Sequence, residues 1–130
     1  LQSNLNEIIS LLYVDDEEVL LNQGKLFLER SGEFRVDIMK SAHDALNSPV
    51  IQSYDAIISD YQMPEMDGYE ATRILKERGV KTPIIALTAS LPREIEDRIK
   101  STGINDIVVK PFIPSELFKL ILHYTGIHRF

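Results

Sequence analysis

Residues 8–18 of the chain read IISLLYVDDEE. The first seven of these residues are almost all Ile, Leu or Val, a pattern typical of a strand that is covered on both faces. Four acids, residues 15–18, follow directly, and acids favour the first turn of a helix because they interact with its dipole. We therefore predict a buried strand, an acidic turn and then a helix.

The same unit of strand and helix recurs along the rest of the chain. Short apolar runs cover residues 35–39, 56–59, 84–87 and 107–109, and segments with helical spacing separate them. Run 35–39 alternates polar with apolar residues, so we place it at the edge of the sheet, and we expect the others to be covered on both faces. Repeated strand–helix units require parallel pairing with right-handed crossovers. The predicted fold class is α/β, a (βα)5 doubly wound open parallel sheet.

Several residues mark the boundaries and faces of the helices. Pro49 interrupts the helix after residues 35–39, so we expect that helix to start at Ser41 and to break or restart at Pro49 with Ser48 as cap. The other boundary signals are Asp67 and Pro114 at helix starts, and Gly79 and Gly103 at helix ends. Apolar spacing predicts the inner helix faces at Leu20, Gly24 and Phe27, at Ile95 and Ile99, and at Leu117, Leu120, Ile121 and Tyr124.

Length and composition limit the classes of function. The chain has 130 residues, 44% of them hydrophobic and 26% charged, which is typical of one globular domain. We assign that domain to residues 8–126, with tails at 1–7 and 127–130. The net charge of −6, without a basic patch, argues against binding of nucleic acid. The chain starts at Leu1 and not at methionine, so we expect it to come from a longer protein.

The chain lacks the features of a membrane or secreted protein. No apolar run reaches the roughly 18 residues of a membrane span, and the first residues do not have the pattern of a signal peptide. The sequence contains no cysteine, which is compatible with a reducing compartment. We therefore expect no membrane insertion and a cytoplasmic location.

Polar residues follow the predicted strands at the edge where parallel strands end together. Asp15 and Asp16 follow the first strand, Asp60 the third, Thr88 the fourth and Lys110 the fifth. Ligands of open α/β sheets bind at this edge. Three crowded carboxylates repel one another, and a hard divalent cation such as Mg²⁺ removes that cost. Together with a hydroxyl and a lysine, they form a set suited to phosphoryl transfer.

Four segments resemble receiver domains of two-component response regulators, in the order of that family. They are residues 13–17 (YVDDE), 59–68 (SDYQMPEMDG), 87–89 (LTA) and 108–112 (VVKPF). The resemblance implies a flavodoxin-like, CheY-like sheet with strand order 2-1-3-4-5. It also implies that the chain is a signalling module and not an enzyme.

The resemblance assigns a role to each site residue. Asp60 accepts a phosphoryl group from a histidine kinase or a histidine phosphotransfer protein, and the modified domain then acts on a downstream protein or a linked output domain. Asp15, Asp16 and Asp60, with the backbone carbonyl of Gln62, bind Mg²⁺. Thr88 and Lys110 contact the phosphoryl group. In one departure, Ile107 stands where many receivers carry a switching Tyr or Phe.

Two other functions compete with this one. A Mg²⁺-dependent aspartyl phosphatase of the haloacid-dehalogenase type needs a second aspartate two residues after the nucleophile, and that position is Gln62. A degenerate receiver that binds a partner without phosphorylation is disfavoured because every expected site residue is present. Nucleotide-binding enzymes are also disfavoured, since the six glycines form no phosphate-binding motif.

Overall fold

A computed structural model describes residues 8–30, 32–49, 51–60, 68–88, 103–109 and 114–125 of the chain. Within these ranges the side chains at positions 42, 52, 60, 68–71 and 114 are not described. All statements below concern this part of the chain. The predicted signals at Asp67, Ile95 and Ile99 lie outside it.

One parallel sheet forms the centre of the molecule. Its strands are β1 (Ile9–Val14), β2 (Phe34–Met39), β3 (Ala56–Asp60), β4 (Ile84–Thr88) and β5 (Asp106–Val109). They are ordered β2-β1-β3-β4-β5 and every neighbouring pair is parallel. The predicted fold class and strand order are confirmed.

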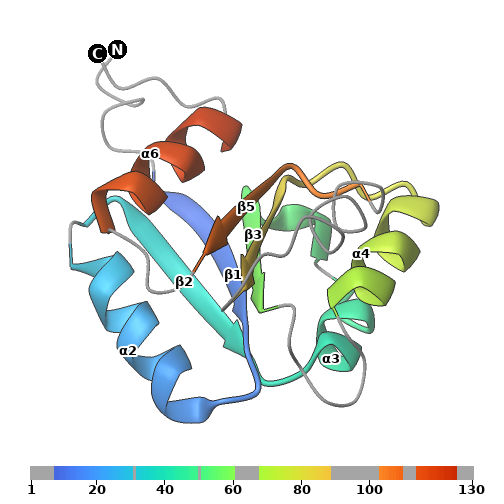
Figure 1. Ribbon diagram of the computed structural model, residues 1–130, viewed down its shortest axis with the longest axis horizontal. Coiled ribbons are helices and arrows are strands. Elements are labelled where there is room, and N and C mark those ends of the chain that lie inside the picture. The colour runs from blue at the N-terminus through green and yellow to red at the C-terminus, as the bar shows by residue number, and fades with distance from the viewer. Residues whose placement is uncertain are drawn as a thin grey trace.

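Helices cover both faces of this sheet (Figure 1). Helices α2 (Glu18–Glu29) and α6 (Pro114–Thr125) lie on one side, and α3 (Ala42–Leu46) and α4 (Gly68–Glu77) lie on the other. Successive residues of a strand point to opposite faces, so Ile9, Leu11 and Tyr13 join the core under α2 and α6. Leu12 and Val14 join the core under α3 and α4. This alternation buries the apolar side chains of β1 against both helix layers.

The two outer strands differ from the central ones in burial. Strand β2 lies at one edge and alternates as predicted, with Arg35 exposed and Val36 buried. Strand β5 was predicted to be covered on both faces, and that prediction is wrong: residues 106–108 are only half-buried and Val109 is 42% exposed. The reason is its position, since β5 pairs with β4 alone. Its apolar sequence did not indicate an edge.

Most helix boundaries among the described residues follow the predicted signals. Ser41 Oγ accepts a hydrogen bond from the Asp44 N–H at 3.0 Å, which caps the start of α3. The helix ends at Leu46, and the chain resumes after Pro49 as a single 3₁₀ turn, η1 (Ile51–Ser53). Helix α6 begins at Pro114. Gly79, two residues after α4 ends, has the positive φ of 83° that favours glycine at such a place.

One predicted helix face needs a correction. Leu20 was assigned to the inner face of the first helix, but its side chain is 37% exposed. The residues of α2 that are fully buried are Leu21 and Leu28. These two are seven residues apart, so they lie on one face after two turns. On the last helix the prediction is confirmed, because Leu117 and Ile121 are buried.

The longest helices, α2 and α6, have 12 residues each. Among the residues described above, no helix is long and apolar enough to span a membrane.

Candidate functional site

The carboxyl ends of the central strands lie side by side, as the sequence predicted. Val14 pairs with Ser59, Asp60 with Leu87, and Thr88 with Val109. Asp15 follows Val14 directly, so the chain brings Asp15, the backbone of Asp60 and Thr88 to one edge of the sheet. Gln62 and Lys110 lie outside the described residues. Their assignments therefore stay predictions.

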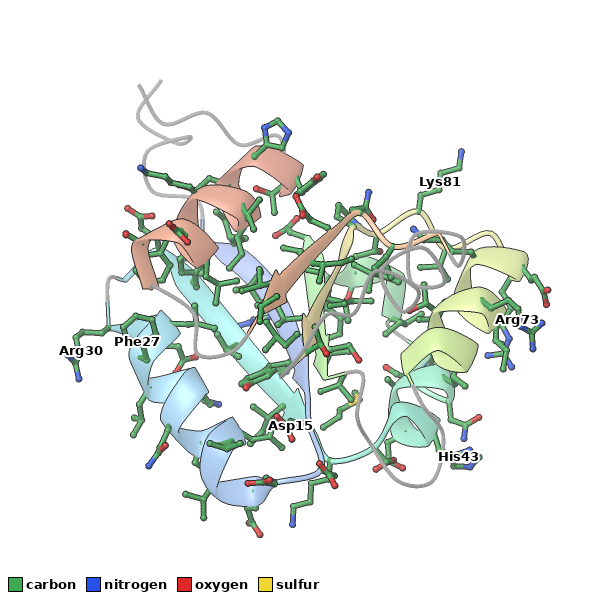
Figure 2. All side chains as sticks on the ribbon, viewed as in Figure 1. Asp15, Phe27, Arg30, His43, Arg73 and Lys81 are labelled. Carbon is green, nitrogen blue, oxygen red and sulfur yellow. The ribbon has the colours of Figure 1, made fainter. Side chains whose placement is uncertain are left out.

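Asp15 is the most deeply buried polar residue of this edge. Its exposed fraction is 0%. Its backbone N–H donates to the Met39 carbonyl oxygen at 3.1 Å, and its Oδ1 atom accepts a hydrogen bond from the Glu17 N–H at 3.0 Å. Figure 2 shows Asp15 where the chain leaves the end of β1. These bonds hold a desolvated carboxylate in one place between β1 and α2.

The next residues carry more negative charge toward solvent. Asp16, Glu17 and Glu18 are exposed. Glu17 occupies the N-cap position of α2 but makes no side-chain capping bond there. Glu18 lies in the first helical turn, where an acid interacts well with the helix dipole. The edge thus combines one buried carboxylate with exposed ones beside it.

Lys40 brings a positive charge to this acidic edge, and sequence reasoning missed it. It follows the end of β2 directly, and its Nζ atom lies 3.1 Å from Glu18 Oε2. The ion pair links the end of β2 to the start of α2. The sequence does carry a signal for Lys40, because it is the polar residue that follows the second predicted strand.

Thr88 ends β4 and is 2% exposed. It brings a buried hydroxyl group to this edge of the sheet. Ile107 is half-buried in β5 and pairs with Ala86, two residues before Thr88. The position at which many receivers carry a switching Tyr or Phe thus holds an aliphatic side chain in this chain.

The donor set at the edge suits a hard divalent cation. Within the described ranges there is no group of three or more His, Asp or Glu side chains arranged around a metal position; the Asp60 side chain is not among those described. Asp15 and Asp16 supply carboxylate oxygens, the ligands that Mg²⁺ prefers. A carboxylate as buried as that of Asp15 is costly in charged form, and a bound cation offsets this cost. The residues present therefore fit a Mg²⁺ ion.

Comparisons of the sequence identify relatives over most of the chain. The family model for the response regulator receiver domain matches residues 11–122. Response regulator Rre1 of Synechocystis sp. is 38% identical over 119 residues, which cover 88% of this chain and 51% of that protein. Hybrid signal transduction histidine kinase L of Dictyostelium discoideum is 34% identical over 122 residues, which cover 88% of this chain and 7% of that protein. The chain thus spans about half, or far less, of the length of these curated relatives.

A solved structure agrees in fold. The receiver domain of sensor histidine kinase PA1611 from Pseudomonas aeruginosa, crystallised with a magnesium ion coordinated in its active-site cleft, has 34% sequence identity and a TM-score of 0.80. The match covers 92% of this chain and 99% of that one. With the family match, the strand order and the acidic edge in agreement, this chain belongs to the family of response regulator receiver domains of two-component signalling.

Proposed function

We propose that Asp60 is the phosphoacceptor of this receiver domain and that its phosphorylation requires Mg²⁺. The observation that carries the proposal is the shared edge of β1, β3 and β4. Strand β3 ends at Asp60 between strands that end beside a buried carboxylate, Asp15, and a buried hydroxyl, Thr88. A phosphoryl group on Asp60 would meet both kinds of group.

The proposed reaction is an in-line transfer from a phosphohistidine. The Asp60 carboxylate oxygen attacks phosphorus, a phosphorus–oxygen bond forms, and the phosphorus–nitrogen bond to the imidazole breaks. The electron pair of the broken bond returns to the imidazole nitrogen, which takes up a proton. The Thr88 hydroxyl donates a hydrogen bond to a phosphoryl oxygen, and Lys110 offsets the negative charge.

Asp15, Asp16, Asp60 and the backbone carbonyl of Gln62 would hold Mg²⁺, which supplies positive charge to the anionic groups that meet in the transfer. Asp15 suits this role because its backbone and Oδ1 bonds fix the carboxylate before any ligand arrives. Asp16 lies beside it on the solvent side. The exposed Lys40–Glu18 pair places the ammonium group of Lys40 at the start of α2, near these acids.

The partners follow from this chemistry. The phosphodonor is a histidine kinase or a histidine phosphotransfer domain, and the output is a downstream protein or a linked domain whose binding changes after phosphorylation. The domain acts as a signalling module and not as an enzyme with its own substrate turnover. Its location is the cytoplasm, where ATP-dependent formation of phosphohistidine takes place.

Intact-mass spectrometry tests the acceptor. With Mg²⁺ and acetyl phosphate, we expect one phosphoryl adduct on the wild type and none on Asp60→Asn. The matched control is Asp44→Asn, which removes an exposed carboxylate from α3 and should keep the adduct. Omitting Mg²⁺ or adding a chelator should also prevent the adduct. An adduct that persists on Asp60→Asn would refute the assignment.

A further inference from the structure

The ring of Tyr13 lies against the backbone of α2 at Gly24. A Cβ atom placed on Gly24 would lie 3.1 Å from Tyr13 Cδ2 and only 2.4 Å from Cε2, and the second distance is closer than real Cβ atoms approach. Glycine is therefore the residue that lets this ring occupy its place beneath the helix. Tyr13 is only 6% exposed, so the contact belongs to the core.

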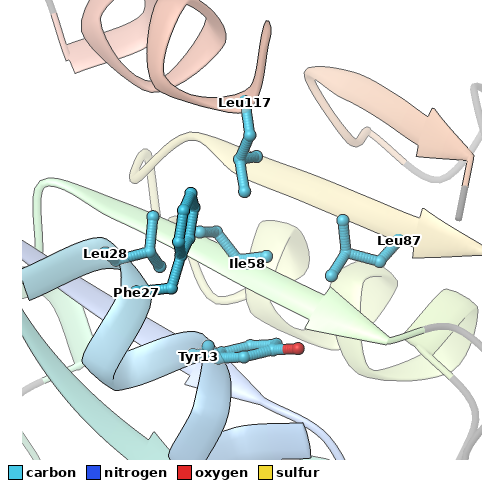
Figure 3. A pocket seen from close by; sticks show the side chains of 7 residues that line it. Tyr13, Phe27, Leu28, Ile58, Leu87 and Leu117 are labelled. Carbon is cyan, nitrogen blue, oxygen red and sulfur yellow. The ribbon is translucent and has the colours of Figure 1, made fainter. Parts of the chain in front are cut away.

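A small cavity lies beside this ring (Figure 3). Phe27, Leu28 and Leu117 line it from the two helices, and Ile58 and Leu87 line it from the sheet. Its volume is about 10 Å³, close to the least that a single water molecule needs. The lining exposes apolar surface alone. The cavity therefore offers the ring space to shift and does not suit a bound molecule.

The three strands that bring Asp15, Asp60 and Thr88 to the edge, β1, β3 and β4, each contribute a side chain to this cavity. Tyr13 precedes Asp15 by two residues, Ile58 precedes Asp60 by two, and Leu87 is the residue before Thr88. Figure 3 shows the Tyr13 oxygen directed toward the carboxyl ends of β3 and β4. The hydroxyl thus points toward the edge that carries the proposed site, while the ring faces the cavity.

We propose that Tyr13 is the moving link between the phosphorylation site and helices α2 and α6, an inference that rests on the proposed function. A phosphoryl group and Mg²⁺ change the charge at the edge that the hydroxyl faces. The changed hydrogen bonding draws the hydroxyl, and the ring shifts within the space beside it. Because the ring contacts α2 at Gly24 and shares the cavity with Leu117 of α6, both helices respond. Packed cores take up such shifts as discrete rearrangements.

Methyl NMR tests this link, because a ring that moves changes the shifts of the methyl groups around it. The signals to follow are those of Ile58, Leu87 and Leu117. Spectra are recorded with Mg²⁺, before and after beryllium fluoride, a phosphoryl mimic. Fluorine NMR of the bound mimic measures site occupancy separately in every variant. We compare the wild type with Tyr13→Phe, which keeps the ring and removes the hydroxyl.

Tyr54→Phe is the matched control. Tyr54 is 8% exposed in the core on the opposite face, and its hydroxyl donates to Asp37 Oδ2 at 2.7 Å. We expect the wild type and Tyr54→Phe to show large shifts at the three residues when the site is occupied, and Tyr13→Phe to lose most of them. Wild-type shifts in an occupied Tyr13→Phe would overturn the link and leave the proposed function standing. A wild type that does not bind the mimic would overturn the proposed function and the link with it.

Gly24→Ala perturbs the same contact from the helix side. The added methyl must displace the ring, and the cavity is the space available beside it. We expect the resting spectrum of this variant to show the three residues already shifted, with little further change at full occupancy. Resting shifts equal to those of the wild type, followed by a full response, would contradict the proposed role of the ring contact.

Discussion

Strand β3 has an aspartate at each end, Asp55 before its first residue and Asp60 as its last. At the amino edge, Asp55 Oδ2 accepts a hydrogen bond from the Ser10 N–H at 2.8 Å. Nearby, Asn105 Oδ1 accepts from the Ile84 N–H at 2.9 Å. Polar side chains at this edge thus satisfy the backbone of the sheet. Asp55 and Asn105 each accept a hydrogen bond from a backbone N–H group.

The carboxyl edge collects mostly negative charges, of which Glu18 is paired with Lys40. The buried Asp15 lies beside exposed Asp16, Glu17 and Glu18, on the edge where β3 ends at Asp60. Like charges that gather in one place raise the free energy of the folded chain. The difference teaches that amino-edge residues serve stability, whereas carboxyl-edge residues are arranged for a ligand. Substitutions at the two edges should therefore change the free energy of unfolding in opposite directions, and they should differ in their effect on phosphorylation.

The largest effect is expected for Asp55→Ala. This change leaves the part-buried Ser10 N–H without its carboxylate acceptor, and the loss of such a charge-assisted bond costs about 2 kcal/mol. Urea denaturation should show this loss in the free energy of unfolding. The folded variant should still form the phosphoryl adduct. If the folded variant failed to form the adduct, the assignment of a purely stabilising role to the amino edge would be wrong.

Asn105→Ala should cost somewhat less. It removes the acceptor of the Ile84 N–H, where β4 begins. An unsatisfied buried donor of this kind costs about 1.5 kcal/mol. The control is Asn105→Asp, which keeps an oxygen acceptor and should recover much of the loss in urea denaturation. Equal destabilisation by both variants would show that the bond is not the cause.

Tyr124→Phe tests the same edge as a function of pH. The hydroxyl donates to the Asn105 carbonyl oxygen and to Asp106 Oδ2, both at 2.9 Å, and its removal should cost about 1 kcal/mol. Burial, then the hydrogen bond to Asp106 and the charge of that residue, raises the pKa of Tyr124 above its usual 10.0. A group whose pKa is raised on folding adds stability below its unfolded pKa, and this stability is lost as the pH rises through the folded value.

The gap in unfolding free energy between wild type and Tyr124→Phe should therefore be full below pH 10.0 and shrink above it. Urea denaturation series at several pH values measure this gap. A gap that stays constant into strong alkali would contradict the assigned pKa direction.

Asp16→Asn has the smallest expected effect, and the opposite sign. It removes one of the crowded negative charges, so the metal-free protein should become more stable by about 0.5 kcal/mol. Mg²⁺ affinity should fall in isothermal titration calorimetry, since a carboxylate ligand is lost. Thermal unfolding in chelator and in Mg²⁺ separates the two effects. A clearly destabilised metal-free variant would mean that Asp16 has a structural role.

Much of the fold could be predicted because it depends on patterns that are local in the sequence. Apolar runs and helical spacing gave all five strands and the order of the elements, and Pro49 marked the break after α3. The errors came from neighbours that are distant in sequence. The apolar run of β5 does not reveal that only β4 pairs with it. Leu20 and Leu21 are adjacent in α2, and which of the two is buried depends on how the helix is oriented against the sheet.

The candidate site was predicted in part for a related reason. Residues that follow parallel strands meet at one edge, so Asp15, Asp60 and Thr88 could be grouped from the sequence. Asp60 could be assigned to this edge because it follows its strand, whereas the hydrogen bond of Asp55 to Ser10 at the other end depends on strand pairing that the sequence does not show. The contact of Tyr13 with Gly24 was missed because a glycine within a helical pattern carries no information about the ring beneath it.

Mapping the phosphorylated residue tests the central claim most directly. Borohydride reduces an aspartyl phosphate to homoserine, so the labelled residue loses one oxygen atom and gains two hydrogens. After reaction with acetyl phosphate and Mg²⁺, tandem mass spectrometry of proteolytic peptides locates that change. The account predicts homoserine at Asp60 and unmodified aspartate at Asp55, at the other end of the same strand. Homoserine at Asp55, or at another aspartate in place of Asp60, would contradict it.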